Sequence, residues 1–140
     1  MATNWDSKKN LLIVAPFKGD AFSLRKLFEE RYPIHVYQDL SSLSANLDEN
    51  TGLVILTEES LAGDMSCLGE ALDQQPRWSE IPIILLASSK GRSGRESEMA
   101  RRRLPVSAGH VIVLERPLSS ASLLSASAAA WRSRERQFEM

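Results

Sequence analysis

The chain has 140 residues, 43% hydrophobic and 25% charged, and a formal net charge of −1. This length and balance are typical of one globular domain and exclude an intrinsically disordered chain. The near-equal numbers of basic and acidic residues exclude a whole-molecule field that attracts nucleic acid or an anionic membrane.

A buried strand and an amphipathic helix open the chain. The run from Leu11 to Ala15 is continuously apolar and is closed by Pro16, which is typical of a strand covered on both faces. Asp20 is then placed to act as the N-cap of a helix. The expected apolar face of that helix consists of Ala21, Leu24, Leu27 and Phe28.

Two similar units follow. A short strand at residues 34–36 precedes a weaker helix with Ser41 or Ser42 near its start. Gly52 opens an unbroken apolar run at residues 53–56, which predicts another buried strand. The helix expected after this strand has apolar residues at spacings of four, three and four, namely Leu61, Met65, Leu68 and Leu72.

The second half of the chain continues the alternation. Residues 81–86 predict a further buried strand. A loop at residues 88–94 and a short polar helix at residues 96–103 lead to the last strand, residues 111–114. Residues 119–138 predict a long alanine-rich helix.

The alternation of five buried strands with five helices predicts right-handed crossovers and a parallel sheet. The expected fold class is α/β, a three-layer flavodoxin-like (βα)5 sandwich whose five-stranded parallel sheet has the order 2-1-3-4-5. We expect a polar lead-in at residues 1–9 and one domain at residues 10–130. Residues 131–140 are expected to form the end of the last helix and to continue into a linker or coiled coil.

Ligands of such sheets bind outside the carboxyl ends of the strands, so these ends are where a functional site is expected. The residues at the strand ends are Ala15, Pro16, Thr57, Glu58, Ala87 and Arg116. This constellation resembles the receiver domain of bacterial response regulators, the CheY-like superfamily, with its key residues replaced.

In receivers the first strand ends in an acidic pair that helps to hold Mg²⁺, and the middle strand ends in the aspartate that accepts the phosphoryl group. The corresponding positions here are Ala15, Pro16 and Thr57. The phosphate-sensing hydroxyl and the lysine of receivers correspond to Ala87 and Arg116. The resemblance therefore implies a receiver scaffold with no catalytic residue, no phospho-acceptor, no metal site and no cofactor.

Longer segments resemble the pseudo-receiver found at the N-terminus of some proteobacterial sensor histidine kinases. The more specific segments are Thr-Glu-Glu at residues 57–59 and Leu-Glu-Arg-Pro at residues 114–117. The resemblance implies a phosphorylation-independent regulatory domain of a two-component signalling protein. Such a domain is not itself an enzyme and acts by protein–protein contact or dimerisation.

The last helix is the most suggestive candidate for contact with a partner. It ends in a charged Arg/Glu stretch without a C-cap glycine, as if it continued into a coiled coil. Candidate interface residues for a homodimer or a signalling partner are Val113, Leu123, Leu124 and Trp131. The alternative is that these side chains only cover the sheet.

A second hypothesis is a ligand-sensing module. Thr57, Glu58 and Arg116 would then form a polar pocket for a small anion or nucleotide, whereas the alternative is a structural ion pair of Arg116. The segment 90–103 is basic and is a second candidate anion site, but it lacks interleaved aromatic residues, so we do not expect it to bind nucleic acid. Residual phosphotransfer is a third possibility.

No metal, redox or membrane site is predicted. His35 and His110 stand without Cys or carboxylate partners at metal-ligand spacing. Cys67 is the single cysteine and is expected to be a reduced structural thiol. Because there is no membrane-spanning apolar run and no secretion signal at the N-terminus, we expect a cytoplasmic domain without membrane contact.

Overall fold

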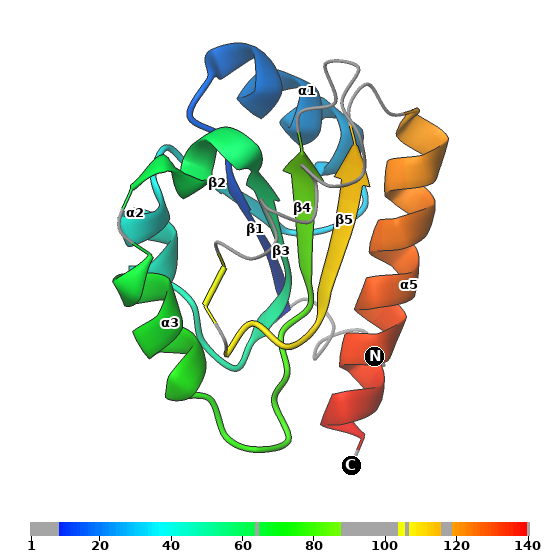
Figure 1. Cartoon of the computed structure of the whole chain (residues 1–140). Helices are drawn as coiled ribbons and strands as arrows, with labels where there is room; N and C mark the ends of the chain where they lie inside the picture. Colours follow the sequence, from blue (N-terminus) through cyan, green and yellow to red (C-terminus); the bar gives the residue numbers. More distant parts are fainter. Residues whose placement is uncertain (1–8, 64, 88–103, 106, 116–118, 140) are drawn as a thin grey trace.

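The computed structural model describes residues 9–63, 65–87, 104–105, 107–115 and 119–139. Five parallel strands form one sheet in the order β2-β1-β3-β4-β5 (Figure 1). The strands are β1 (Asn10–Val14), β2 (Ile34–Tyr37), β3 (Thr51–Thr57), β4 (Ile83–Ala87) and β5 (Val111–Glu115). The predicted fold class and strand order are confirmed.

Helices cover both faces of this sheet, which gives the three layers seen in Figure 1. The described helices are α1 (Lys18–Phe28), α2 (Leu40–Ala45), α3 (Ser66–Asp73), α5 (Ser120–Phe138) and the 3-10 helix η2 (Glu58–Ala62). Buried residues of α2, η2 and α3 pack on one face of the sheet, and those of α1 and α5 pack on the other. The helix predicted at residues 96–103 lies outside the described residues. None of the helices in the described part of the chain is long and apolar enough to cross a membrane.

The core explains the continuous apolar runs of the strands. Leu12 and Val14 of β1 belong to the cluster under α2 and α3, whereas Leu11 and Ile13 belong to the cluster under α1 and α5. Every residue of β3 and β4 is buried. Since both faces of the sheet are covered, its central strands have no polar face, as is usual for parallel sheets.

Helix α1 begins before its predicted cap. The helix starts at Lys18, and Phe17 occupies the N-cap position without a side-chain hydrogen bond. The prediction that Asp20 is the N-cap is therefore wrong: Asp20 lies in the first turn, where its charge complements the positive end of the helix dipole. Helix α2 has a true side-chain cap, because Asp39 Oδ1 accepts a 2.8 Å hydrogen bond from the backbone N–H of Ser42.

The single helix predicted after β3 is two helices. Leu61 lies in η2, which ends at Gly63, whereas Met65 is the N-cap of α3. Leu68 and Leu72 are the buried residues of α3. All four apolar side chains pack in or against one core cluster. The spacing therefore predicts the core contacts correctly but misses the break between the two helices.

The packed structure extends beyond residue 130. Trp131 packs against Tyr32 with ring centroids 4.4 Å apart, and Arg134 is fully buried. The structured unit therefore includes α5 to its end at Phe138, and continuation of this helix into a linker or coiled coil stays a prediction. Of the predicted polar lead-in, only Lys9 is described, and it is buried.

Candidate functional site

The carboxyl ends of three neighbouring strands meet at one edge of the sheet. Val14 of β1 pairs with Leu56 of β3, so the next residues, Ala15 and Thr57, end adjacent strands. Thr57 in turn pairs with Leu86 of β4, one residue before Ala87. The structure thus brings these three predicted site positions to one edge of the sheet.

This edge is closed and almost entirely apolar at those positions. Ala15 is 2% exposed, Ala87 is 1% exposed and Thr57 is 0% exposed. The Thr57 hydroxyl is buried, and among the described residues Oγ1 has no hydrogen-bond partner. The Thr57 carbonyl accepts a 2.6 Å hydrogen bond from Ser60 Oγ. Thr57, which the sequence predicts to correspond to the receiver aspartate, is therefore a small side chain that solvent does not reach.

The residues at this edge do not fit the Mg²⁺ ion that a receiver fold implies. Mg²⁺ takes hard oxygen ligands in a near-octahedral shell, and carboxylates usually supply them. Ala15, Pro16 and Thr57 carry no carboxylate, and Glu58 supplies only one. Within the described residues, no group of three or more His, Cys, Asp or Glu side chains could hold a metal ion.

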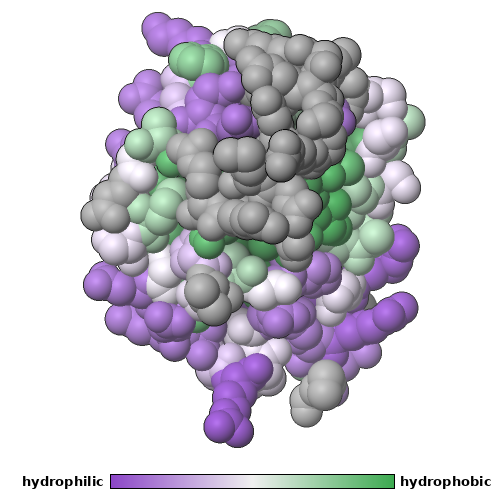
Figure 2. Space-filling view, in the orientation of Figure 1, coloured by the Kyte–Doolittle hydropathy of each residue, from purple (hydrophilic) through white to green (hydrophobic). Residues whose placement is uncertain are grey.

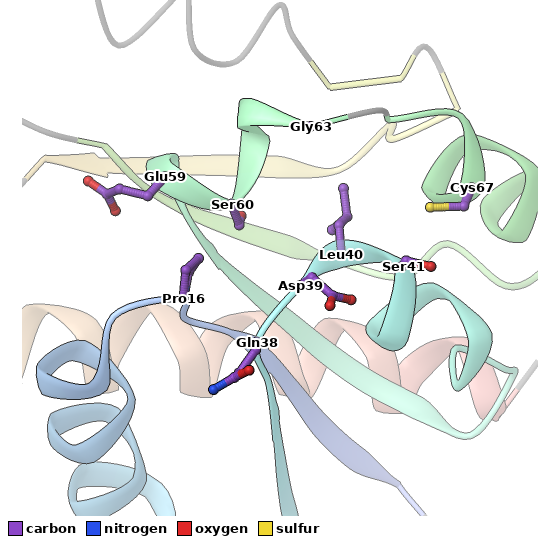
Figure 3. A pocket seen from close by; sticks show the side chains of 9 residues that line it. All are labelled: Pro16, Gln38, Asp39, Leu40, Ser41, Glu59, Ser60, Gly63 and Cys67. Carbon is purple, nitrogen blue, oxygen red and sulfur yellow. The ribbon is translucent and has the colours of Figure 1, made fainter.

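A pocket of about 480 Å³ opens on the β2 side of this edge, as Figure 3 shows. It is lined by Pro16, Gln38, Asp39, Leu40, Ser41, Glu59, Ser60, Gly63 and Cys67. Cys67, the single cysteine, is half-buried, and its reduced state stays a prediction. Sequence reasoning predicted Pro16 at this edge but missed the pocket, because the residues after β2 match no motif.

The charged side chains that line the pocket are both carboxylates. Asp39 and Glu59 point away from each other in Figure 3, so they do not converge on a common cation. The hydrogen bond from the Ser42 backbone lowers the pKa of Asp39, which keeps this group ionised at neutral pH. The pocket is therefore electrostatically unfavourable for an anion.

The other predicted anion sites are not described. Arg116 and the basic segment 90–103 lie outside the described residues. Glu58 is half-buried and Glu115 is exposed at the end of β5. Pairing of Arg116 with either carboxylate, and ligand binding by the basic segment, stay predictions.

The candidate interface residues differ in how deeply they are buried. Leu123 is 2% exposed and belongs to the core, so for this residue the alternative reading, covering the sheet, holds. Val113, Leu124 and Trp131 are half-buried and pack against the core clusters. In Figure 2 a hydrophobic surface lies along β5 beside the residues drawn in grey. The exposed positions of α5 are mostly small or basic and include Ser122, Ser125, Ala129, Arg132 and Arg136.

A buried cation lies near the amino ends of the strands, away from the pocket. Arg134 Nε donates to the Thr51 carbonyl and Nη2 to the Glu49 carbonyl, both at 2.8 Å, and Nη1 donates to Gln137 Oε1 at 2.7 Å. Its guanidinium carbon lies 4.8 Å from the centroid of the Phe138 ring. Burial lowers the pKa of Arg134 to about 10.

Sequence reasoning missed this anchor because it expected the Arg/Glu stretch to continue into a linker or coiled coil. The spacing of Arg134 along the last helix could have revealed its burial. Arg134 follows Ser127, Ala130 and Trp131 at helical spacing on the face of α5 that packs on the sheet. This contact fixes the last turns of α5 to the start of β3.

Comparison with known proteins gives structural matches only. The sequence matches no protein-family model and no curated protein. The structure is similar to a response regulator receiver modulated diguanylate cyclase from Pelobacter carbinolicus, with a TM-score of 0.67 and 19% identity over 94% of this chain and 99% of that chain.

Two further solved structures agree with this match. The signal receiver domain of an HD domain-containing protein from Pseudomonas fluorescens Pf-5 has a TM-score of 0.68 and 18% identity, over 94% of this chain and 91% of that chain. A CheY-like receiver domain protein from Methanospirillum hungatei JF-1 has a TM-score of 0.65 and 16% identity, over 92% and 98% respectively. The chain therefore has the fold of response-regulator receiver domains.

Proposed function

We propose that this chain is a receiver-like regulatory domain of a two-component signalling protein that works without phosphorylation. It acts by contact with a protein partner or with a second copy, and the proposed context is a sensor histidine kinase. The receiver fold supports the signalling class. The segments 57–59 and 114–117, which resemble a kinase-linked pseudo-receiver, support the context.

The burial of Thr57 carries this proposal. A phospho-acceptor must be reached by the phosphoryl donor and must lie beside a metal that neutralises the developing charge. Thr57 is 0% exposed, and its neighbours at the strand ends, Ala15 and Ala87, offer no ligand. Retention of the scaffold without this chemistry favours a role in binding.

Incubation with acetyl phosphate and Mg²⁺, followed by intact mass measurement, tests the proposal. We expect no phosphorylated species, whereas a genuine receiver domain treated in parallel gains one phosphoryl group. Stoichiometric labelling of this chain would overturn the proposal. Loss of that labelling in a Glu58→Gln variant would then assign the acceptor to the carboxylate next to Thr57.

Light scattering across a range of protein concentrations tests whether the chain forms a dimer. A dimer whose population grows with concentration supports self-association. A monomer throughout removes self-association and leaves the partner protein. Truncation after Ala130 is not a usable control, because it deletes Trp131 and the buried Arg134. Arg132→Glu, an exposed position on the same helix, is the better variant.

The ligand-sensing alternative finds no support in the described pocket. Its charged side chains, Asp39 and Glu59, would repel an anion or a nucleotide. Unchanged affinity of an Arg116→Ala variant for every anion that binds the chain would remove the remaining version of this alternative at the strand ends.

A further inference from the structure

The loop between α3 and β4 carries an exposed tryptophan. Arg77 and Trp78 lie at the tip of a tight turn, which the backbone N–H of Ser79 closes with a 2.9 Å hydrogen bond to the Pro76 carbonyl. Trp78 is 40% exposed. Because the loop precedes β4, this tryptophan lies at the amino ends of the strands, beside the C-terminal end of α5 and away from the candidate functional site (Figure 1). We call residues 76–79 the Trp78 turn.

Contacts with α5 hold this turn in place. The side chain of Gln137 pairs with both backbone groups of Glu80: Oε1 accepts a 2.7 Å hydrogen bond from the N–H, and Nε2 donates a 2.8 Å hydrogen bond to the carbonyl. The Trp78 ring packs edge-on against Phe138, with ring centroids 5.2 Å apart. A partner that covers the exposed part of the ring therefore has little left to order, which lowers the entropic cost of binding.

Charges of opposite sign precede and follow the ring along the loop. Arg77 comes directly before Trp78, Glu80 follows two residues after it, and both charged side chains are exposed. Within the described part of the chain, neither side chain forms an ion pair. A cation and an anion next to one aromatic ring make a surface that is complementary to itself, because in a two-fold contact each residue meets a different residue of the same surface.

We infer that the Trp78 turn is a contact between two copies of this chain. In the two-fold arrangement the two Trp78 rings pack against each other, and Arg77 of each copy pairs with Glu80 of the other. Tryptophan is enriched among the residues that carry the binding energy of interfaces. Since one turn from each copy buries less than the roughly 1,200 Å² of a stable interface, the dimer is weak, with a dissociation constant between about 10 µM and 1 mM.

Other partners fit the Trp78 turn less well. A nucleic acid or an anionic membrane surface would meet the Glu80 carboxylate near the ring and be repelled by it. A uniformly acidic or basic protein segment would pair with one of the two charges and be repelled by the other. A second copy pairs with both charges, so it is the occupant that this charge pattern favours.

This inference rests on the proposed function, because it names a second copy as the partner and the Trp78 turn as the contact. The two can still fail separately. A chain that stays monomeric would overturn the contact and leave the absence of phosphorylation as it is. Phosphorylation of the chain would overturn the proposed function, whereas the contact lies at the other end of the sheet and would still be measurable.

Sedimentation equilibrium of the full chain, at concentrations up to about 1 mM, tests the contact. We expect a monomer–dimer equilibrium whose dissociation constant rises at least about tenfold in the Trp78→Ser variant. Phe17→Ser is the matched control, because Phe17 is also an exposed aromatic residue, at 56%, but follows β1 at the opposite end of the sheet. It should change the dissociation constant by less than about threefold.

Two charge reversals test the two-fold arrangement. Arg77→Glu and Glu80→Lys each place like charges opposite one another, so each variant alone should dimerise at least about tenfold more weakly than the unchanged chain. An equimolar mixture of the two variants should form a heterodimer, because one loop is then acidic and the other basic. Only a contact that joins these two positions across the two-fold axis predicts this recovery.

Three results would overturn the inference. The first is the absence of a dimer at concentrations up to about 1 mM. The second is a dimer that Trp78→Ser does not weaken. The third is a mixture of the two charge-reversed variants that associates no better than either variant alone. Far-UV circular dichroism verifies that each variant stays folded, which we expect because Gln137 bonds only to the backbone of Glu80.

Discussion

Arg134 shows how one side chain fixes a helix to the domain. Taking its charge out of water is a cost, seen in the lowered pKa of about 10, although Glu49 and Asp48 favour the charged form. Its hydrogen bonds to the Thr51 and Glu49 carbonyls, and to Gln137, offset that cost. The three nitrogen atoms of the planar guanidinium reach these partners at once, whereas a lysine ammonium carries all its donors on a single nitrogen.

We therefore predict that Arg134→Lys lowers the free energy of unfolding by about 1–3 kcal/mol, because a buried carbonyl loses its donor. Urea denaturation measures this change. The matched control is Arg132→Lys, an exposed position two residues earlier, which should change stability by less than about 0.5 kcal/mol. Equal effects of the two substitutions would show that the buried hydrogen bonds contribute nothing.

Substitutions of Thr57 test whether the carboxyl end of β3 is closed to solvent. Its hydroxyl is buried and, among the described residues, has no partner. Thr57→Val should therefore leave the free energy of unfolding unchanged or raise it by up to about 1 kcal/mol. Thr57→Asp should lower it by at least about 1–3 kcal/mol, because the carboxylate has no partner and its charge is desolvated. A stable Thr57→Asp variant that binds Mg²⁺ would mean that the strand end is open.

At the scale of elements, the approach of α5 to β3 depends on a glycine. A Cβ atom built at Gly52 would lie 2.7 Å from Trp131 Cζ3. Gly52→Ala should therefore destabilise the fold by about 1–3 kcal/mol through overpacking. Gly19→Ala is the matched control, since nothing lies within 4 Å of its Cβ position and it sits in α1. There the same change should stabilise by up to about 1 kcal/mol, so equal shifts in the melting temperature would contradict this account.

The cap of α2 gives a pH dependence of known sign. The hydrogen bond from Ser42 holds the pKa of Asp39 below its ordinary value. The folded state therefore keeps this carboxylate ionised at lower pH than the unfolded state, and the stabilisation is lost as pH falls through the lowered pKa of the folded state. Asp39→Ala should lower the melting temperature more at pH 7 than at pH 3, and Asp39→Asn should retain most of the cap. Equal losses at both pH values would exclude a role for the charge.

Elements could be predicted from sequence where a single physical cause sets the pattern. The strand runs and their order follow from burial on both faces, so residues 53–56 and 81–86 sufficed to place central strands. The break at Gly63 could not be predicted, because Leu61 and Met65 reach the same core from two helices as they would from one. The burial of Arg134 was equally hidden, since it depends on carbonyls that lie 83 and 85 residues away in sequence.

At the scale of the whole molecule, the stability of the fold does not depend on the strand-end residues that bind metal and phosphate in receivers. Both core clusters consist mainly of strand interiors and helix faces, and among the described strand-end positions only Ala15 belongs to one of them. Ala15, Pro16 and Thr57 at these positions are compatible with this packing and supply no carboxylate ligand for Mg²⁺. A scaffold of this kind can still present its surfaces to partners.

The most direct measurement of the central claim is an NMR titration of the isotope-labelled chain with Mg²⁺ and then with beryllofluoride, an analogue of the phosphoryl group. The account predicts no saturable change in the amide signals of Ala15, Thr57, Glu58 and Ala87 at concentrations that saturate a genuine receiver. Saturable shifts that spread from these strand ends through the domain would contradict it, because they would show that the site still binds metal and phosphoryl group.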